Sequence, residues 1–170
     1  EMVNTLNRSG GGTGLTTLVA AAVTDDCLWL ANVGDSRAYL IEAAGGVRRQ
    51  LTEDHSSQVL AHKQRNATGA NETSSYIRIV RSEITRAIGM SERVEVDTYR
   101  YTWAVGDILV LCSDGLVALP EGEMVHLALT QPPDQAARMM VERAVELDGS
   151  DNTTVVLALH LVLVQKHGMS

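Results

Sequence analysis

Short apolar runs separated by turn signals dominate the first third of the chain. Strands are predicted where these runs are rich in β-branched and aliphatic residues, at 15–24, 27–33, 37–41 and 47–51. Asp25-Asp26, Gly34-Asp35 and Ala44-Gly45-Gly46 separate them as turns. Because turns of two residues cannot join parallel strands, the pattern predicts an antiparallel meander.

The middle of the chain changes character. Residues 55–64 predict a helix, and the polar, turn-rich residues 65–75 predict a mobile loop. The remaining segments of this part are residues 77–88, compatible with strand or helix, and the predicted strands 94–102 and 108–112.

The last third predicts two helices and a closing strand. One helix spans residues 120–130 and the other residues 134–147. The second has apolar residues at helical spacing, namely Ala137, Met140, Val141, Ala144 and Val145. Residues 152–164 predict a long final strand. Hairpins outnumber helices, so the fold class is α+β: a layered antiparallel sheet with helices packed outside.

Length and composition narrow the classes of function. The 170 residues predict one domain, residues 1–170. A net charge of -7 disfavours a nucleic-acid binder. No apolar run is long enough to span a membrane and no signal peptide opens the chain, so we expect a cytoplasmic protein. Cys27 and Cys112 lie in apolar runs and are expected to be buried, without a disulfide framework.

Three aspartates occupy comparable positions beside predicted strands. Asp35 and Asp114 each follow a strand, and Asp151 precedes one. In an antiparallel sheet, the end of one strand lies beside the start of its neighbour, so the three carboxylates could meet at one edge. Such a cluster would hold Mg²⁺, Mn²⁺ or Ca²⁺, which prefer oxygen ligands. Aspartate also favours turns for local reasons, and spacing alone leaves both interpretations open.

Other catalytic patterns are incomplete. Gly34-Asp35-Ser36 is similar to the nucleophile block of some serine hydrolases, but no downstream D-x-x-H follows. The glycine-rich residues 10–17 lack the lysine of a phosphate-binding loop. The five histidines are scattered without metal-ligand spacing.

Read in order, the segments resemble the bacterial form of the metal-dependent type 2C protein serine/threonine phosphatases. The matching segments are GTGLTTLVAAAV (12–23), ANVGDSRAYLI (31–41), LTEDHS (51–56), ITRAIGM (84–90), GDILVLCSDGL (106–116) and DNTTVVL (151–157). The resemblance implies a two-layer antiparallel β-sandwich flanked by helices. It also implies a centre of two Mn²⁺ or Mg²⁺ ions, with Asp114 and Asp151 as metal ligands. Asp35 would be linked to metal-bound water or to a third, weaker ion.

The resemblance also implies chemistry and a flap. Phosphoserine or phosphothreonine in a protein would be hydrolysed by a metal-activated water without a covalent phosphoenzyme. The polar stretch at about 57–80 falls where the family has a variable flap.

Two departures from the family pattern limit what we expect of this chain. The D-G-x-G-G motif, whose Asp bridges both ions in the family, does not occur, and Ala118 stands where many members have Asp. We therefore expect an N-terminally truncated sandwich, the C-terminal portion of a catalytic domain. Without the bridging anion, two ions would repel, so we expect few or no ions bound and weak or no activity. Exposed sheet edges would favour a homodimer or pairing with another segment.

Three hypotheses follow from this comparison. The first is a phosphoprotein phosphatase represented by part of its catalytic domain. The second is a catalytically dead pseudophosphatase that acts as a binding or regulatory module. The third is another metal-dependent phosphohydrolase on the same scaffold, related to sporulation and stress-response regulators.

Overall fold

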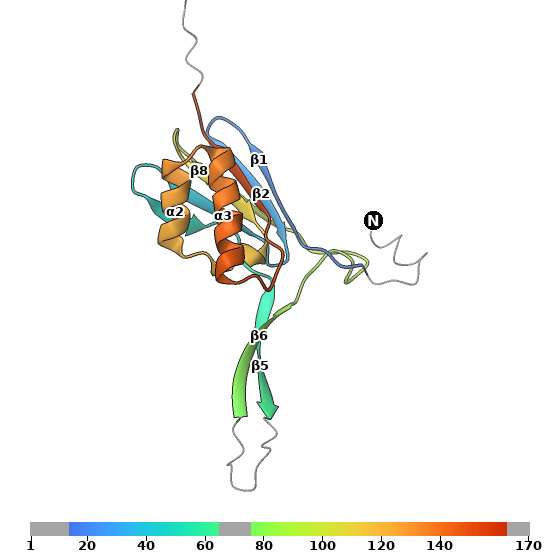
Figure 1. Cartoon of the computed structure of the whole chain (residues 1–170). Helices are drawn as coiled ribbons and strands as arrows, with labels where there is room; N and C mark the ends of the chain where they lie inside the picture. Colours follow the sequence, from blue (N-terminus) through green and yellow to red (C-terminus); the bar gives the residue numbers. More distant parts are fainter. Residues whose placement is uncertain (1–13, 65–75, 163–170) are drawn as a thin grey trace, which may run out of the picture.

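The computed structural model describes residues 14–64 and 76–162 (Figure 1). The elements follow in the order β1 (Leu18–Val23), β2 (Cys27–Val33), β3 (Arg37–Glu42), β4 (Val47–Gln50), β5 (Ser56–Gln64), β6 (Tyr76–Ile84), β7 (Asp97–Thr102), β8 (Ile108–Cys112), the short 3₁₀ helix η1 (Asp114–Ala118), α2 (Glu121–Thr130), α3 (Pro133–Leu147) and β9 (Val155–Leu159).

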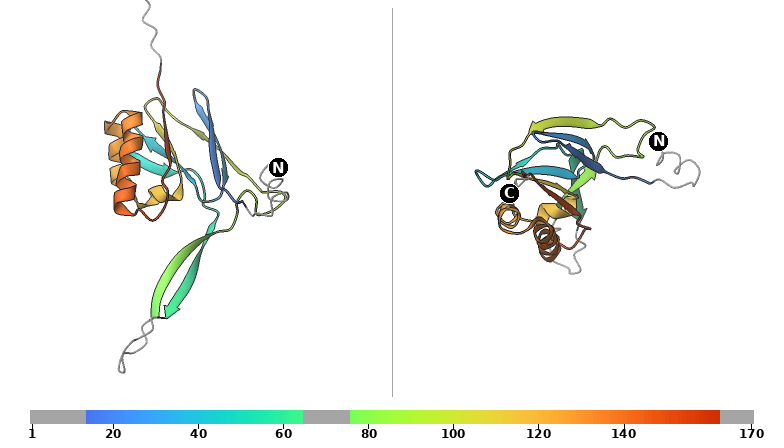
Figure 2. Two further views of the ribbon diagram at one scale, coloured as in Figure 1. Left: turned by 45° about the vertical axis from the view of Figure 1, so that its right-hand side comes forward. Right: turned by 90° about the horizontal axis from the view of Figure 1, so that it is seen from above.

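These strands form two sheets and a separate hairpin, all antiparallel. One sheet has the order β1-β2-β7, the other β4-β3-β8-β9, and β5 pairs only with β6. Figure 2 shows the two sheets as layers, with α2 and α3 beyond the four-stranded sheet. The β5–β6 hairpin projects away from this body (Figure 1). The expected α+β sandwich is therefore confirmed.

Two apolar clusters hold the layers together. Leu28 and Leu30 of β2 meet Leu40 of β3 and Leu109 of β8 between the sheets. On the opposite face of the four-stranded sheet, a second cluster joins β3 and β8 to the helices, through residues that include Tyr39, Val110, Met124 and Met140. Alternation along β3 explains this arrangement, because Leu40 and Tyr39 point to opposite faces of one sheet.

The helices cover one side of the sandwich only. Both pack on the four-stranded sheet (Figure 2). On the outer face of the three-stranded sheet, Trp29 is 51% exposed, and the Arg100 guanidinium lies 5.2 Å from the centre of its ring. No helix among the described residues covers that face. The prediction of helices packed outside the sheets therefore holds for the four-stranded sheet alone.

The helix predicted over residues 55–64 is wrong. Residues 56–64 form β5, which pairs with β6 in a continuous register from Ser56↔Ile84 to Gln64↔Tyr76. The backbone gains a full ladder of hydrogen bonds from this distant partner, and tertiary pairing of that kind overrides helix propensity. The pairing also decides between strand and helix for residues 77–88: they continue the strand β6 as far as Ile84. The loop predicted at 65–75 lies outside the described residues.

The meander prediction is also wrong at Gly34-Asp35. β2 and β3 do not pair; the chain leaves one sheet at Val33 and enters the other at Arg37. β2 lies between β1 and β7, and β3 lies between β4 and β8, so each strand already has a partner on both of its edges. A turn signal alone cannot distinguish a hairpin from a crossing between sheets. The hairpins β1–β2 and β3–β4 are as predicted.

The C-terminal elements agree with the sequence pattern except in detail. In α3, Ala136, Met140 and Ala144 are fully buried, whereas Val145 is 49% exposed, so the buried face is turned slightly from the predicted one. The closing strand is shorter than predicted and spans Val155–Leu159. Across the described residues, no helix is both long and apolar enough to cross a bilayer. Cys27 and Cys112 are free and buried, as expected, and burial raises the pKa of the Cys112 thiol to about 12.

Candidate metal centre

The three aspartates singled out in the sequence line one cavity. Asp35 follows β2, Asp114 follows β8 and Asp151 precedes β9, and all three border a cavity of about 660 Å³. Its remaining wall is partly apolar, with Leu15, Ile84, Ala87 and Met90. The structure thus brings together carboxylates from three segments that are far apart in the chain.

Two backbone segments hold Asp114 close to Asp151. The Ser113 backbone N–H donates to the Thr154 carbonyl at 3.1 Å, and the Thr154 N–H donates to Ser113 Oγ at 3.0 Å. Gly115 permits the contact, because a Cβ there would lie 2.6 Å from Thr153 Oγ1 and 2.7 Å from the Asn152 carbonyl oxygen. The SDG and DNTT motifs therefore pack closely against each other, joined by hydrogen bonds between their backbones and to the Ser113 hydroxyl.

Asp35 is positioned by a tight turn between the sheets. Gly34 has a φ of 107°, a region that favours glycine, and a Cβ there would lie 2.6 Å from Thr17 Cβ. After the turn, the Ser36 hydroxyl lies 2.9 Å from the Thr17 hydroxyl. The small residues of the GTGLTT and GDSR motifs thus pack together beside Asp35.

The site carries uncompensated negative charge. Burial, and then the nearby charge of Asp114, raise the pKa of Asp35 above its ordinary value of 3.8. Arg37, two residues away, offsets this only weakly, because its guanidinium is engaged by the carboxylate of Asp54. A cation placed between the carboxylates would relieve this repulsion.

The LTEDHS segment braces the GDSR segment. Leu51 N–H donates to the Ala38 carbonyl at 2.7 Å, and Ala38 N–H donates to Thr52 Oγ1 at 3.0 Å. Arg37 Nε lies 2.9 Å from Asp54 Oδ1. The sequence identifies LTEDHS as a motif shared with the family but predicts no role for its side chains; its run of polar residues is the signal that points to one.

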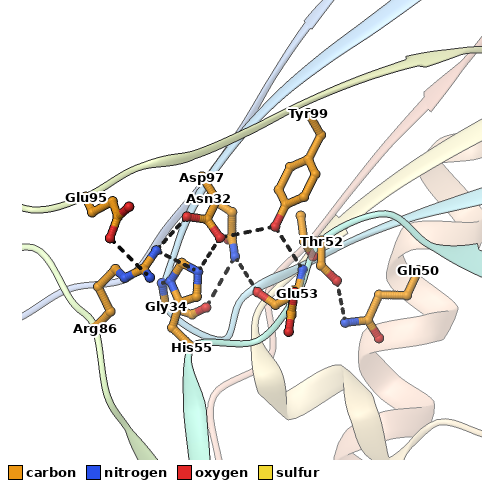
Figure 3. Close-up of polar contacts among 10 residues, drawn as sticks. All are labelled: Asn32, Gly34, Gln50, Thr52, Glu53, His55, Arg86, Glu95, Asp97 and Tyr99. Atoms are coloured by element: carbon orange, nitrogen blue, oxygen red, sulfur yellow. Dashed lines mark hydrogen bonds and ion pairs between the residues drawn. The ribbon is translucent and has the colours of Figure 1, made fainter.

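A buried histidine completes this support (Figure 3). Gly34 N–H donates to His55 Nδ1 at 3.0 Å, and His55 Nε2 lies 2.9 Å from Asp97 Oδ2. Arg86 NH1 donates to Asp97 Oδ1 at 2.6 Å. The Asn32 amide donates to the Gly34 carbonyl at 3.3 Å. The backbone just before Asp35 is therefore held by several side chains.

The donor set fits a divalent cation only in part. Carboxylate oxygens are suitable ligands for Mg²⁺ or Mn²⁺, and, in addition to burial, the charge of Asp114 raises the pKa of Asp35. However, among residues 14–64 and 76–162, no group of three or more His, Cys, Asp or Glu side chains is close enough to hold an ion. A second cavity of about 350 Å³ adjoins the first and is lined by Asp114, Ala118, Asp148 and Asp151. These residues could hold an ion only with further ligands.

Comparison with known sequences gives one consistent result. A sequence model described as Protein phosphatase 2C matches residues 3–153. The serine/threonine phosphatase stp of Listeria innocua is 38% identical over 144 residues, which cover 84% of this chain and 55% of that protein. The chain therefore spans only about half the length of this curated relative.

Solved structures resemble the fold. The serine/threonine phosphatase MsPP of Mycobacterium smegmatis, in complex with cacodylate, has a TM-score of 0.70 at 29% identity, covering 94% of this chain and 68% of that one. The catalytic domain of the serine/threonine phosphatase PstP, in complex with two manganese ions, has a TM-score of 0.69 at 23% identity, covering 93% and 65%. The second likeness concerns the fold alone.

Proposed function

The chain belongs to the protein phosphatase 2C family of serine/threonine phosphatases, and from this premise we propose that it hydrolyses phosphoserine or phosphothreonine in proteins as part of a larger catalytic unit. Residues 1–170 would form one domain, the C-terminal portion of that unit. The observation that carries the proposal is the lining of one cavity by Asp35, Asp114 and Asp151.

Each carboxylate has a separate role in this proposal. Asp114 and Asp151, held together by Ser113 and Gly115, would be direct ligands of Mn²⁺ or Mg²⁺. Asp35 would accept a hydrogen bond from metal-bound water or help to hold a weaker ion. The bound ion supplies Lewis acidity, which activates water and neutralises phosphoryl charge. The chain itself fixes the carboxylates in advance through the braced turn at Gly34.

The centre needs further ligands in order to work. The D-G-x-G-G motif does not occur in these 170 residues, and the described residues do not form a ligand group of three. Two ions close together require an anion between them, because their repulsion is otherwise uncompensated. We therefore propose that this chain alone binds at most one ion weakly and turns over slowly or not at all.

A pseudophosphatase is the second candidate. The incomplete ligand group among the described residues favours it. In that case the braced carboxylates would persist as remnants of the fold, and the chain would act by binding a partner. The two candidates differ in whether the complete catalytic unit releases phosphate.

The test is Mn²⁺-dependent release of phosphate from a phosphothreonine peptide. Asp114→Ala serves as the variant without a ligand, and Asp25→Ala, an exposed turn residue, as the matched control. Release that Asp114→Ala abolishes and Asp25→Ala retains would support the phosphatase. Equal background release from all three proteins would mean that this chain is an incomplete catalytic unit or a pseudophosphatase, and release restored by an added segment that carries the D-G-x-G-G motif would then support the phosphatase.

A further inference from the structure

A single histidine holds both backbone polar groups of the glycine that precedes Asp35. The His55 ring accepts a hydrogen bond from Gly34 N–H at Nδ1, 3.0 Å away. The His55 backbone N–H donates to the Gly34 carbonyl, also at 3.0 Å. His55 is 7% exposed, so water does not compete for these bonds.

The hydrogen bonds assign the protonation of the ring. Since Nδ1 accepts from Gly34, the proton of the neutral ring lies on Nε2, which donates to Asp97 Oδ2. Arg86 NH1 lies 3.1 Å from Nε2, but both atoms are then donors, so Arg86 acts by donating to Asp97. Asp97 and Arg86 thus fix the orientation of the ring, and the ring fixes Gly34.

We propose that His55 is a positioning residue, which sets the backbone of Gly34 through Nδ1 and thereby places Asp35 in the cavity. The inference deepens the proposed function and rests on it for the role of Asp35. The alternative is a purely structural role, in which His55 would only fill space next to the start of the β5–β6 hairpin. The two roles differ in whether the position of Asp35 depends on the Nδ1 acceptor of His55.

The turn makes Asp35 sensitive to Gly34. At a φ of 107°, Gly34 has a backbone conformation that residues with a side chain rarely adopt, so its hydrogen bonds, rather than a packed side chain, hold it in place. Loss of the Nδ1 acceptor would release the N–H of Gly34 and leave it unpaired in a buried place. Rotation there would swing the next residue, Asp35, away from Asp114.

Two substitutions separate the functions of the ring. His55→Asn keeps an acceptor near the place of Nδ1, whereas His55→Gln keeps an amide N–H near the place of Nε2 and removes that acceptor. His126→Gln, on the exposed face of α2, is the control for histidine replacement. All variants are made in the full 170-residue chain, labelled with ¹⁵N.

Amide hydrogen exchange decides the proposal without any metal. We expect His55→Gln to speed the exchange of Gly34 about tenfold, the value of one hydrogen bond, and to speed that of Asp35 and Ser36 as well. His55→Asn and His126→Gln should leave all three close to wild type. Two results would overturn the proposal. One is that His55→Asn and His55→Gln speed the exchange of Gly34 equally. The other is that the exchange rates of Asp35 and Ser36 stay unchanged in His55→Gln.

Two further measurements complete the design. If His55→Gln does not fold, the scalar coupling between Gly34 N and His55 Nδ1 in the wild-type chain decides, and its absence would overturn the proposal. Mn²⁺ titration tests the proposed function separately: His55→Gln should weaken binding about 10- to 100-fold, as loss of supporting hydrogen bonds does at metal sites. A wild-type chain that binds no Mn²⁺ would count against the ligand roles proposed for Asp114 and Asp151 in this chain, while the exchange contrast would still test the role of His55.

Discussion

The guanidinium of Arg37 grips the carboxylate of Asp54, with Nε 2.9 Å from Oδ1 and 3.0 Å from Oδ2. Arg37 belongs to the segment that carries Asp35, and Asp54 to the segment that carries His55. Each side chain is less than one quarter exposed. The pair therefore ties two motifs of the candidate centre together at a place where water screens the charges only partly.

We predict that Asp54→Ala lowers the free energy of unfolding by about 1–3 kcal/mol. Removal of one partner leaves a half-buried guanidinium without its anion, and the loss is smaller than for a fully buried pair. Urea denaturation followed by circular dichroism measures the change. The Arg48–Glu121 pair at 3.1 Å is the matched control, because Glu121 is 56% exposed. Glu121→Ala should cost less than about 1 kcal/mol, and equal costs for the two would contradict the prediction.

Gly115→Ala should separate Asp114 from Asp151. The added Cβ would lie 2.6 Å from Thr153 Oγ1 and 2.7 Å from the Asn152 carbonyl oxygen, so the backbone before β9 must move. We expect Mn²⁺ affinity to fall at least about tenfold, because misplaced supporting groups have that effect at metal sites. Titration with detection of free Mn²⁺ by electron paramagnetic resonance measures it.

Gly122→Ala is the control for this substitution. Nothing lies within 4 Å of a Cβ at Gly122, which is in α2. Alanine there should leave the stability of the chain unchanged or slightly increased, because Gly122 lies in the first turn of the helix, and should leave Mn²⁺ affinity unchanged. Equal affinity in the two variants would show that the contact at Gly115 does not hold the ligands in place.

The sequence predicted the elements better than it predicted their partners. Local pattern predicts the β1–β2 and β3–β4 hairpins, β8 and both helices, because neighbouring residues determine their turns and the spacing of their apolar positions. It does not predict the strand β5, because this strand depends on pairing with residues of β6 that follow only after the intervening segment 65–75. The change of sheet at Gly34 could not be predicted for a similar reason. Gly34-Asp35 is compatible with a hairpin turn and with a connection between two sheets. Which of the two forms depends on the strands that pair with β2 and β3, and these are distant in the sequence.

The candidate site shows the same division. The positions of Asp35, Asp114 and Asp151 beside strands left open whether the three carboxylates meet, and in the structure they line one cavity. Their roles as ligands stay a prediction. His55 and Ser113 were not predicted, because each acts on the backbone of a distant segment, and such bonds leave no spacing signal in the sequence.

Stability at acid pH should depend on Asp97. Hydrogen bonds from His55, and then from Arg86, lower the pKa of Asp97 below its ordinary value of 3.8. A lowered carboxyl pKa stabilises the fold above the unfolded-state value, and this contribution is lost as pH falls from about 3.8 through the folded value. Unfolding measured from pH 6 to pH 2 should lose stability more steeply in wild type than in Asp97→Asn. Parallel curves would refute the assignment.

Asp35→Asn should stabilise the chain in the absence of divalent ions. Burial and the charge of Asp114 raise the pKa of Asp35, so the ionised carboxylate is disfavoured in the fold, and stability falls as pH rises from 3.8 through the raised value. At neutral pH an amide of the same shape removes that cost. We therefore expect Tm to rise in buffer with a chelator.

Added Mn²⁺ should reverse the order of the two proteins. The ion neutralises the carboxylates of the wild type and stabilises it by mass action, whereas Asp35→Asn has one anion less to offer. Differential scanning fluorimetry with and without Mn²⁺ measures both effects, and Asp25→Asn, in an exposed turn, controls for the loss of one charge. A lower Tm for Asp35→Asn in chelator would show that the carboxylate supports the fold directly, and the picture of a site strained by its own charge would fail.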